Sequence, residues 1–250
     1  MYYQLIQNKE SIFFRVDGDR GKKVGLGHIY RTLKIYRSLK SIFKKRFNYI
    51  FLMKNFKLGR DIIHNLTGER IITINKSINK KIFKETDIVI IDTLGAENFF
   101  LKILNNIGLK NIISFDQIEL KNFNSGTIIN GIFFAKKKLI SKKRNLNIFQ
   151  GPKYIILNNL FSKKIKKTFP KKEIKILISS GGADKKNFLL KMVKILEYYK
   201  NRHFKLFIAA GKGVSKKNPI FSLKKTKNLE IYYNVKNMKK LFDKVDLAVV

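Results

Sequence analysis

Short apolar runs alternate with amphipathic stretches along most of the chain. The run Ser11–Asp17 is rich in strand-forming residues, and after a glycine-bearing loop the segment 28–43 carries apolar side chains at helical spacing. The same alternation predicts further strands at 47–53, 70–74, 87–92, 111–116 and 127–130, and further helices at 58–66, 78–85 and 96–108. This order of strand and helix is typical of an α/β fold.

The strand predicted at Asp87–Asp92 is a nearly continuous apolar run, as expected of a central strand that is buried on both faces. Because strand and helix repeat in turn, we expect right-handed crossovers between parallel strands. Residues 135–175 differ, since they contain lysine runs, two prolines and one convincing apolar run, Tyr154–Asn158. We interpret this segment as the connection between two α/β units, with its apolar run packed against one of them.

The alternation restarts in the last third of the chain, where strands are predicted at 174–179, 205–211, 229–233 and 246–250 and helices at 187–200 and 237–245. The last predicted strand is apolar, as expected of a buried strand, and no helix follows it, so we expect the second unit to be incomplete. The sequence therefore predicts an α/β domain at 1–150, a connecting segment at 151–173 and a partial α/β domain at 174–250.

The charge balance is strongly basic. The 250 residues carry 54 Lys and Arg against 17 Asp and Glu, a formal net charge of +37, which is typical of proteins that bind nucleic acid or an anionic surface. Lysines outnumber arginines 45 to 9 and are spread over the whole length, which favours a general compositional bias over a binding patch. Nucleic acid is therefore not an expected partner. A non-catalytic basic protein that binds anions or nucleic acid stays as an alternative.

The cellular context follows from what the sequence lacks. The chain has no cysteine, which excludes disulfides and thiolate metal sites. Its first residues show no basic segment followed by a long apolar one, so no signal peptide is expected. No apolar run approaches the roughly 18 residues that span a bilayer, so no membrane insertion is expected. These features favour a cytoplasmic protein.

A histidine flanked by glycines lies where the first predicted strand leads into the first helix. Gly25 and Gly27 are expected to let the backbone take a positive φ and approach a ligand closely. His28, in the first helical turn, would point into the crevice at the carboxyl ends of the strands, where its imidazole is suited to general-base catalysis. The alternative is a glycine turn that caps the helix, with an incidental histidine. His64 and His203 are interpreted as surface or packing residues.

Three carboxylates end predicted strands. Asp17, Asp92 and Asp116 would all lie at the same edge of a parallel sheet, where they could bind sugar hydroxyls, orient His28 or hold a metal ion. A metal is the least favoured of these, because no second histidine is near in the sequence. Aspartate is also common at strand ends simply because it begins turns.

The second unit repeats the glycine pattern after its first strand. Gly181 and Gly182, followed by Asp184, can cradle a diphosphate with backbone N–H groups, and the Gly211–Gly213 loop would lie at the same sheet edge. The turn lacks the Lys-Ser/Thr pair of a P-loop, so hydrolysis of a nucleoside triphosphate is not expected. An ordinary strand-to-helix turn is the alternative for each loop.

These segments together resemble one family. FRVDGD and VGLGHIYR near the N-terminus, then IVIID, ISFDQ, TIIN, GPKYIILNNLF, ISSGGADKKN and the final YYNVKNMKKLFDKVDLAVV resemble the UDP-2,4-diacetamido-2,4,6-trideoxy-β-L-altropyranose hydrolases of pseudaminic acid biosynthesis and the related spore coat polysaccharide proteins. The resemblance covers essentially all of the chain, in order. It is specific through the combination of segments rather than through any one of them.

The resemblance implies two Rossmann-like domains of glycosyltransferase-B type. The N-terminal domain would hold the sugar and the C-terminal domain the UDP of a UDP-sugar substrate. Water would attack the anomeric carbon with inversion, without a metal or other cofactor. It implies His28 as the general base, with substrate contacts from the following residues: Asp17, Gly25, Gly27, Arg31, Asp92, Gly181, Gly182 and Asp184. A glycosyltransferase of the same fold in surface polysaccharide synthesis is the nearest alternative.

Overall fold

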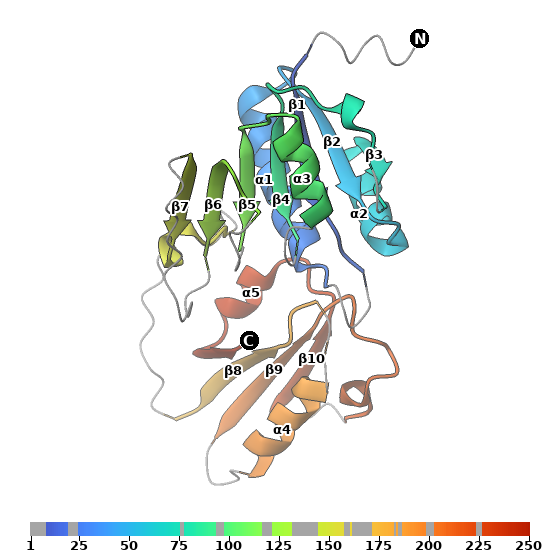
Figure 1. Ribbon diagram of the computed structural model, residues 1–250. Helices are drawn as coiled ribbons and strands as arrows, with labels where there is room; N and C mark the ends of the chain where they lie inside the picture. The colour runs from blue at the N-terminus through green and yellow to red at the C-terminus, as the bar shows by residue number, and fades with distance from the viewer. Residues whose placement is uncertain are drawn as a thin grey trace. The chain divides into compact units, whose positions relative to one another are not determined.

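The computed structural model describes residues 9–19, 25–75, 78–93, 98–116, 122–131, 145–157, 161, 172–182, 184, 187–198, 203–223 and 227–250. The chain divides into two compact units (Figure 1). The first consists of Met1–Asp19 with His28–Ile156, and the second of Arg20–Gly27 with Leu157–Val250. Within these described ranges, no helix is long and apolar enough to cross a membrane.

The first unit is built on a parallel sheet of seven strands in the order β3-β2-β1-β4-β5-β6-β7. The strands are β1 (Ser11–Val16), β2 (Asn48–Met53), β3 (Arg70–Thr73), β4 (Ile88–Asp92), β5 (Ile112–Phe115), β6 (Gly126–Asn130) and β7 (Leu146–Gln150). The helices are α1 (Gly27–Phe43), α2 (Lys57–Thr67) and α3 (Asn98–Asn106), and two 3₁₀ turns cover η1 (Lys80–Ile82) and η2 (Pro152–Tyr154).

Alternation along the central strands gives this sheet two buried faces, each covered by a different helix. Phe13 of β1 belongs to a core that includes Phe100 and Leu104 of α3. On the other face, the ring of Phe14 meets that of Tyr36 on α1 at a centroid distance of 6.0 Å. Because successive residues of a strand point to opposite faces, one apolar strand can support both helices.

The order of the strands places a topological switch point between β1 and β4. From β1 the chain continues outward through β2 and β3, and it then returns to add β4 to β7 on the other side. In open parallel sheets the carboxyl ends of the two strands at such a point flank a crevice that suits ligands. The helix α1, which follows β1, begins at this edge of the sheet.

The second unit has a smaller parallel sheet in the order β10-β9-β8-β11. Its strands are β8 (Ile174–Ser179), β9 (Phe204–Ala210), β10 (Leu229–Tyr233) and β11 (Leu247–Val249), and its helices are α4 (Phe188–Tyr198), α5 (Met238–Phe242) and the 3₁₀ turn η5 (Pro219–Ser222). The helix α4 contributes Leu189 and Val193 to a core on one face, whereas Leu241 of the short α5 packs on the other.

The predicted fold class is confirmed, since both units are α/β with parallel strands, but four details differ from the expectation. No strand was expected at 146–150, but this segment forms β7, because its alternating side chains allow it to extend the sheet beside β6. The helix expected at 78–85 is a single 3₁₀ turn. The apolar run expected to pack at 154–158 does so only in part: the ring of Tyr154 lies 5.5 Å from that of Phe149 on β7, but Ile155 and Leu157 are exposed, and Asn158 lies outside the described residues. The strand β11 is an exposed edge strand rather than a buried one.

The loop after β1 is held by an unusually close approach to α2. A Cβ atom added to Gly59 would overlap the carbonyl oxygen of Gly18 and lie 3.4 Å from the methyl group of Met53. Only a glycine allows α2 and this loop to come so close, and the loop leads from β1 toward the start of α1. Gly59 therefore helps to fix the path of the chain beside the switch point.

We expect Gly59→Ala to destabilise the first unit by about 1–3 kcal/mol, because the backbone contact must open to admit the methyl group. The control is Gly27→Ala, where nothing lies within 4 Å of the added atom. The free energy of unfolding of both variants, measured by urea denaturation, tests this expectation. Equal stabilities would contradict it, since alanine by itself favours a helix.

Candidate active site at the carboxyl edge of the first sheet

A histidine and an aspartate meet at the switch point. His28 lies in the first turn of α1, and Asp92 is the last residue of β4. The Nδ1 atom of His28 is 2.6 Å from Oδ1 of Asp92, whose side chain is fully buried. Because an ionised carboxylate only accepts hydrogen bonds, Nδ1 carries the proton in this pair and the other ring nitrogen, Nε2, is left without one in the neutral imidazole.

Arg31, one helical turn after His28 on α1, donates two hydrogen bonds to the carboxylate of Asp92. Its Nε donates to Oδ2 of Asp92 at 2.8 Å and its Nη2 to Oδ1 at 2.5 Å, which is a two-pronged contact that a lysine cannot make. Thr32 adds a hydrogen bond from its hydroxyl to Oδ2 at 3.2 Å. Arg31 and Thr32 lie three and four positions after His28, as expected of side chains that share one face of a helix with it.

Asp116 completes the group from the neighbouring strand. It follows β5, and its Oδ2 accepts a hydrogen bond from Nη1 of Arg31, while its Oδ1 accepts one from the backbone N–H of Gly131 at 3.1 Å. Its φ of 50° lies in the left-handed region, an uncommon conformation for a residue other than glycine. The guanidinium carbon of Arg31 also lies 5.6 Å from the centroid of the Phe115 ring.

The four side chains of His28, Arg31, Asp92 and Asp116 together carry more negative than positive charge when the imidazole is neutral. One guanidinium faces two carboxylates, so with a neutral imidazole the group has a net charge of −1 in a chain whose total is +37. Burial by itself would raise the pKa of Asp92, but the hydrogen bonds from Arg31 and His28 outweigh it and hold the pKa below its usual range. Burial likewise opposes the charge of Arg31, yet Asp92 and Asp116 raise its pKa.

Asp17 does not join this group through any contact in the described structure. Its Oδ2 accepts from Nη2 of the buried Arg15 at 2.6 Å, and its Oδ1 accepts from the backbone N–H of Lys54 at 2.8 Å. The register pairs Val16 with Asp92, so Asp17 comes one residue after the position that pairs with Asp92. Because successive side chains of a strand point to opposite faces, the side chain of Asp17 points to the face of the sheet opposite to that of Asp92. Asp17 joins β1 to the end of β2.

The two glycines before the histidine have ordinary backbone conformations. Neither Gly25 nor Gly27 has a positive φ, which corrects the conformation expected from the sequence. Nothing lies within 4 Å of a Cβ atom placed on either residue. What glycine provides at these positions is open space at the start of α1, next to His28.

In the second unit, two loops meet at the carboxyl edge of the small sheet. Gly181 has a φ of 70°, and a Cβ atom added to Gly211 would overlap its carbonyl oxygen. The N–H of Gly213 donates to the carbonyl oxygen of Gly182 at 2.8 Å, so backbone contacts join the loops that follow β8 and β9. The hydroxyl of Ser180 is buried there without a hydrogen-bond partner.

Asp184 is engaged within the second unit. Its Oδ1 accepts from the N–H of Leu189 in the first turn of α4 at 3.2 Å, and its Oδ2 accepts from the side-chain amide of Asn218 at 3.0 Å. These bonds tie the start of α4 to the turn η5. Both carboxylate oxygens therefore already have protein partners.

The structure thus brings together His28, Arg31 and Asp92 of the predicted set, and separates Asp17 from them. Sequence reasoning placed Asp116 at the correct edge without selecting it as a site residue, and it missed Thr32. The signal for Thr32 was its spacing of four residues from His28 on one predicted helix. Within the described residues, no group of three or more His, Asp or Glu side chains is arranged to hold a metal ion.

Comparisons with known proteins agree with this fold. No family model matches the chain. The chain is 30% identical over 248 residues to the uncharacterized protein MJ1062 of Methanocaldococcus jannaschii, covering 92% of this chain and 50% of that protein. It is 24% identical over 182 residues to the spore coat polysaccharide biosynthesis protein SpsG of Bacillus subtilis, covering 70% and 52% respectively. The chain therefore spans about half the length of the curated relatives it matches.

Among solved structures, the crystal structure of Acinetobacter baumannii MurG matches with a TM-score of 0.58 at 12% sequence identity, over 96% of this chain and 72% of that one. A match at this identity establishes the fold alone. Together with the two parallel sheets, it shows that the chain has two Rossmann-like units of glycosyltransferase-B type.

The tautomer assigned to His28 can be observed directly. In alkaline buffer, ¹⁵N chemical shifts of the ring are expected to show the proton on Nδ1 in the wild type. In Asp92→Asn, the amide can donate to Nδ1 and the proton is expected to move to Nε2. His64 and His203, both exposed, are the internal references. An unchanged tautomer in the variant would contradict the role of Asp92.

The lowered pKa of Asp92 also predicts how stability depends on pH. The ionised carboxylate stabilises the folded state fully above about pH 4, and this contribution is lost as the pH falls through the lowered pKa. Asp92→Asn is expected to cost about 3–5 kcal/mol at neutral pH, and less as the pH drops below about 4. Urea denaturation across this range tests it, with the exposed Asp61→Asn as the control. If the difference in stability between the wild type and Asp92→Asn did not vary with pH, the hydrogen bonds to the ionised Asp92 would not be the source of that stability.

Proposed function

We propose that this protein is a nucleotide-sugar hydrolase that releases UDP from a UDP-linked diacetamido-trideoxy sugar, in the biosynthesis of pseudaminic or a related nonulosonic acid. The observation that carries the proposal is the pair at the switch point: Asp92 holds His28 by Nδ1 and leaves Nε2 free as a base. The sugar is assigned to residues 1–150 and the UDP to residues 174–250.

The proposed step is a displacement at the anomeric carbon. Nε2 of His28 takes a proton from water, whose oxygen forms a bond to the anomeric carbon while the bond from that carbon to the diphosphate oxygen breaks. The electron pair of the broken bond leaves with UDP, and the sugar is released with an inverted hydroxyl group. Because UDP is a good leaving group, positioning and charge stabilisation carry most of the catalysis.

The local charge supports this assignment. Positive charge develops on the sugar in such a step, and on His28 when it takes the proton, and the net charge of −1 on the group favours both. The same charge disfavours a diphosphate beside Asp92, and Arg31 is already engaged by two carboxylates. We therefore assign the diphosphate to the second unit, at the glycine loops 181–182 and 211–213 that follow β8 and β9 at the carboxyl edge of its sheet.

The comparisons support the coarser part of the proposal. One relative is a polysaccharide biosynthesis protein, which fits an enzyme that acts on nucleotide sugars. A glycosyltransferase would use the same base on an acceptor hydroxyl in place of water, and it is the second candidate because the fold is of glycosyltransferase-B type.

We expect His28→Ala to lower the rate of UDP release from the UDP-sugar by roughly 10²–10⁴-fold, because the general base is lost. The control is His64→Ala, which alters an exposed histidine on α2 and is expected to release UDP at the wild-type rate. Release of UDP is followed by chromatography. A wild-type rate in His28→Ala would overturn the role of His28.

The products separate the two candidate activities. In ¹⁸O-labelled water, a hydrolase places the label on the anomeric hydroxyl of the sugar and none on UDP, whereas a transferase releases little sugar until an acceptor is added. Anomeric proton couplings recorded at early times are expected to show inversion. Label in UDP would show that the bond to phosphorus breaks instead, and would exclude the proposed attack on carbon.

A further inference from the structure

A second polar region lies at the opposite, amino edge of the first sheet. A groove of about 370 Å³ is formed where the end of α1 meets the starts of β2 and β3 and the residue two positions before β1. Its lining consists of Lys9, Lys40, Lys44, Lys45, Phe47, Asn48, Tyr49, Ile50, Glu69 and Arg70. This set is called the basic groove below.

Half of the residues of the basic groove are cationic, whereas Lys and Arg make up only 54 of the 250 residues in the chain. The general lysine bias therefore does not account for the concentration. Lysines near the end of α1 complement the helix dipole, but Lys9 and Arg70 come from the starts of other elements. With five cations and one carboxylate, the lining has a net charge of +4.

The carboxylate does not neutralise this charge. Glu69 accepts hydrogen bonds from Lys40 at 2.5 Å and from the hydroxyl of Tyr36 at 2.7 Å, so it is matched to one lysine alone. In the described part of the chain, the side chains of Lys44, Lys45 and Arg70 face no carboxylate partner within ion-pair distance. Like charges that converge without a counter-ion raise the free energy of the folded state, and an anion in the groove would relieve this repulsion.

A buried donor at the same place is unsatisfied. The side-chain nitrogen of Asn48 is inaccessible to solvent and has no hydrogen-bond partner. A buried N–H group without an acceptor is costly, and its natural partner is an acceptor oxygen supplied from outside the chain. Donors in excess of acceptors, together with a guanidinium fork, match the oxygens of a phosphate group.

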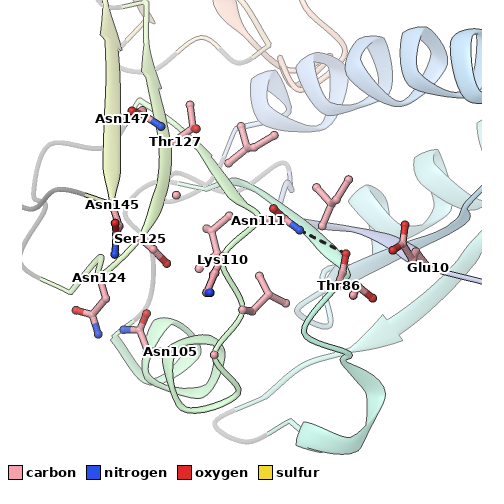
Figure 2. A pocket seen from close by; sticks show the side chains of 16 residues that line it. Glu10, Thr86, Asn105, Lys110, Asn111, Asn124, Ser125, Thr127, Asn145 and Asn147 are labelled. Atoms are coloured by element: carbon pink, nitrogen blue, oxygen red, sulfur yellow. Dashed lines mark hydrogen bonds between the residues drawn. The ribbon is translucent and has the colours of Figure 1, made fainter.

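A second groove at the amino edge of the same sheet is not basic, so the excess of cations belongs to the basic groove and not to the whole edge. It has a volume of about 1010 Å³ and is lined mostly by neutral side chains, with Asn105, Asn124, Ser125, Asn145 and Asn147 among those drawn in Figure 2. Its sixteen lining residues include one cation, Lys110, and one carboxylate, Glu10. The amino edge of one sheet therefore carries a neutral groove and a strongly basic one.

We propose that the basic groove binds a phosphate-bearing anion, independently of the reaction proposed at the opposite edge of the sheet. Its volume suits a phosphate or diphosphate group with a small substituent. Arg70 and Lys44 hold the phosphate oxygens, and the buried amide of Asn48 turns toward the groove to supply a further hydrogen bond.

The experiment uses inorganic pyrophosphate as the probe, at about 0.15 M salt to screen weak long-range attraction. Binding is measured by calorimetry and by ¹H–¹⁵N spectra, in which the side-chain amide of Asn48 is the local reporter. The test variant is Lys44→Ala with Arg70→Ala. The control is Lys102→Ala with Lys110→Ala, which removes the same charge from exposed positions on α3 and in the neutral groove.

We expect pyrophosphate to bind at least tenfold more weakly to the test variant, with the control within twofold of the wild type and the Asn48 amide shifted on binding. A parallel arm uses phosphatidylcholine vesicles with and without phosphatidic acid, because a lipid headgroup carries the same phosphate chemistry. Binding in either arm that depends on Lys44 and Arg70 supports the proposal and identifies the source of the phosphate. Equal losses in both variants, or no binding in either arm, would overturn it.

Discussion

The carboxylate of Asp92 is the interaction on which the candidate site depends. It is fully buried, and it accepts hydrogen bonds from an imidazole, a guanidinium and a hydroxyl that all come from α1. An ionised group in such a place is stable only if donors replace the water that it has lost. The first two turns of α1 supply those donors, so the same contacts that make the buried charge tolerable also fix the position of the helix and the orientation of His28.

The two edges of the first sheet have opposite electrostatic character. At the carboxyl edge, Arg31 is outnumbered by Asp92 and Asp116, and a local negative charge survives within a strongly basic chain. At the amino edge, cations gather around a groove whose single carboxylate is already matched to Lys40. A uniform bias toward lysine would produce neither feature. In the proposed function the carboxyl edge favours a group that becomes positive during the reaction, and the amino edge carries the proposed anion site.

Much of the fold could be predicted from the sequence because its signals are local. The apolar run at 87–92 indicated a strand buried on both faces, and Ile174–Ser179 formed a strand with the predicted bounds. The prediction failed where a segment depends on its neighbours: β7 is held by pairing with β6, and its own pattern lies among lysine runs. In place of the helix expected at 78–85, the chain forms one 3₁₀ turn. The side chain of Asn79 caps the start of this turn by accepting a hydrogen bond from the N–H of Lys81.

The sequence by itself determined most of the order of strands and helices, the parallel sheets and the place of His28 at the start of the first helix, because periodicity and the glycines at element ends are signals that act over a few residues. Only the tertiary structure decided which carboxylate meets that histidine. Asp17 and Asp92 looked equivalent as strand ends, yet a difference of one residue in register turns them to opposite faces of the sheet. The pairing of side chains 61 and 64 residues apart is set by how strands align, and no local pattern encodes it.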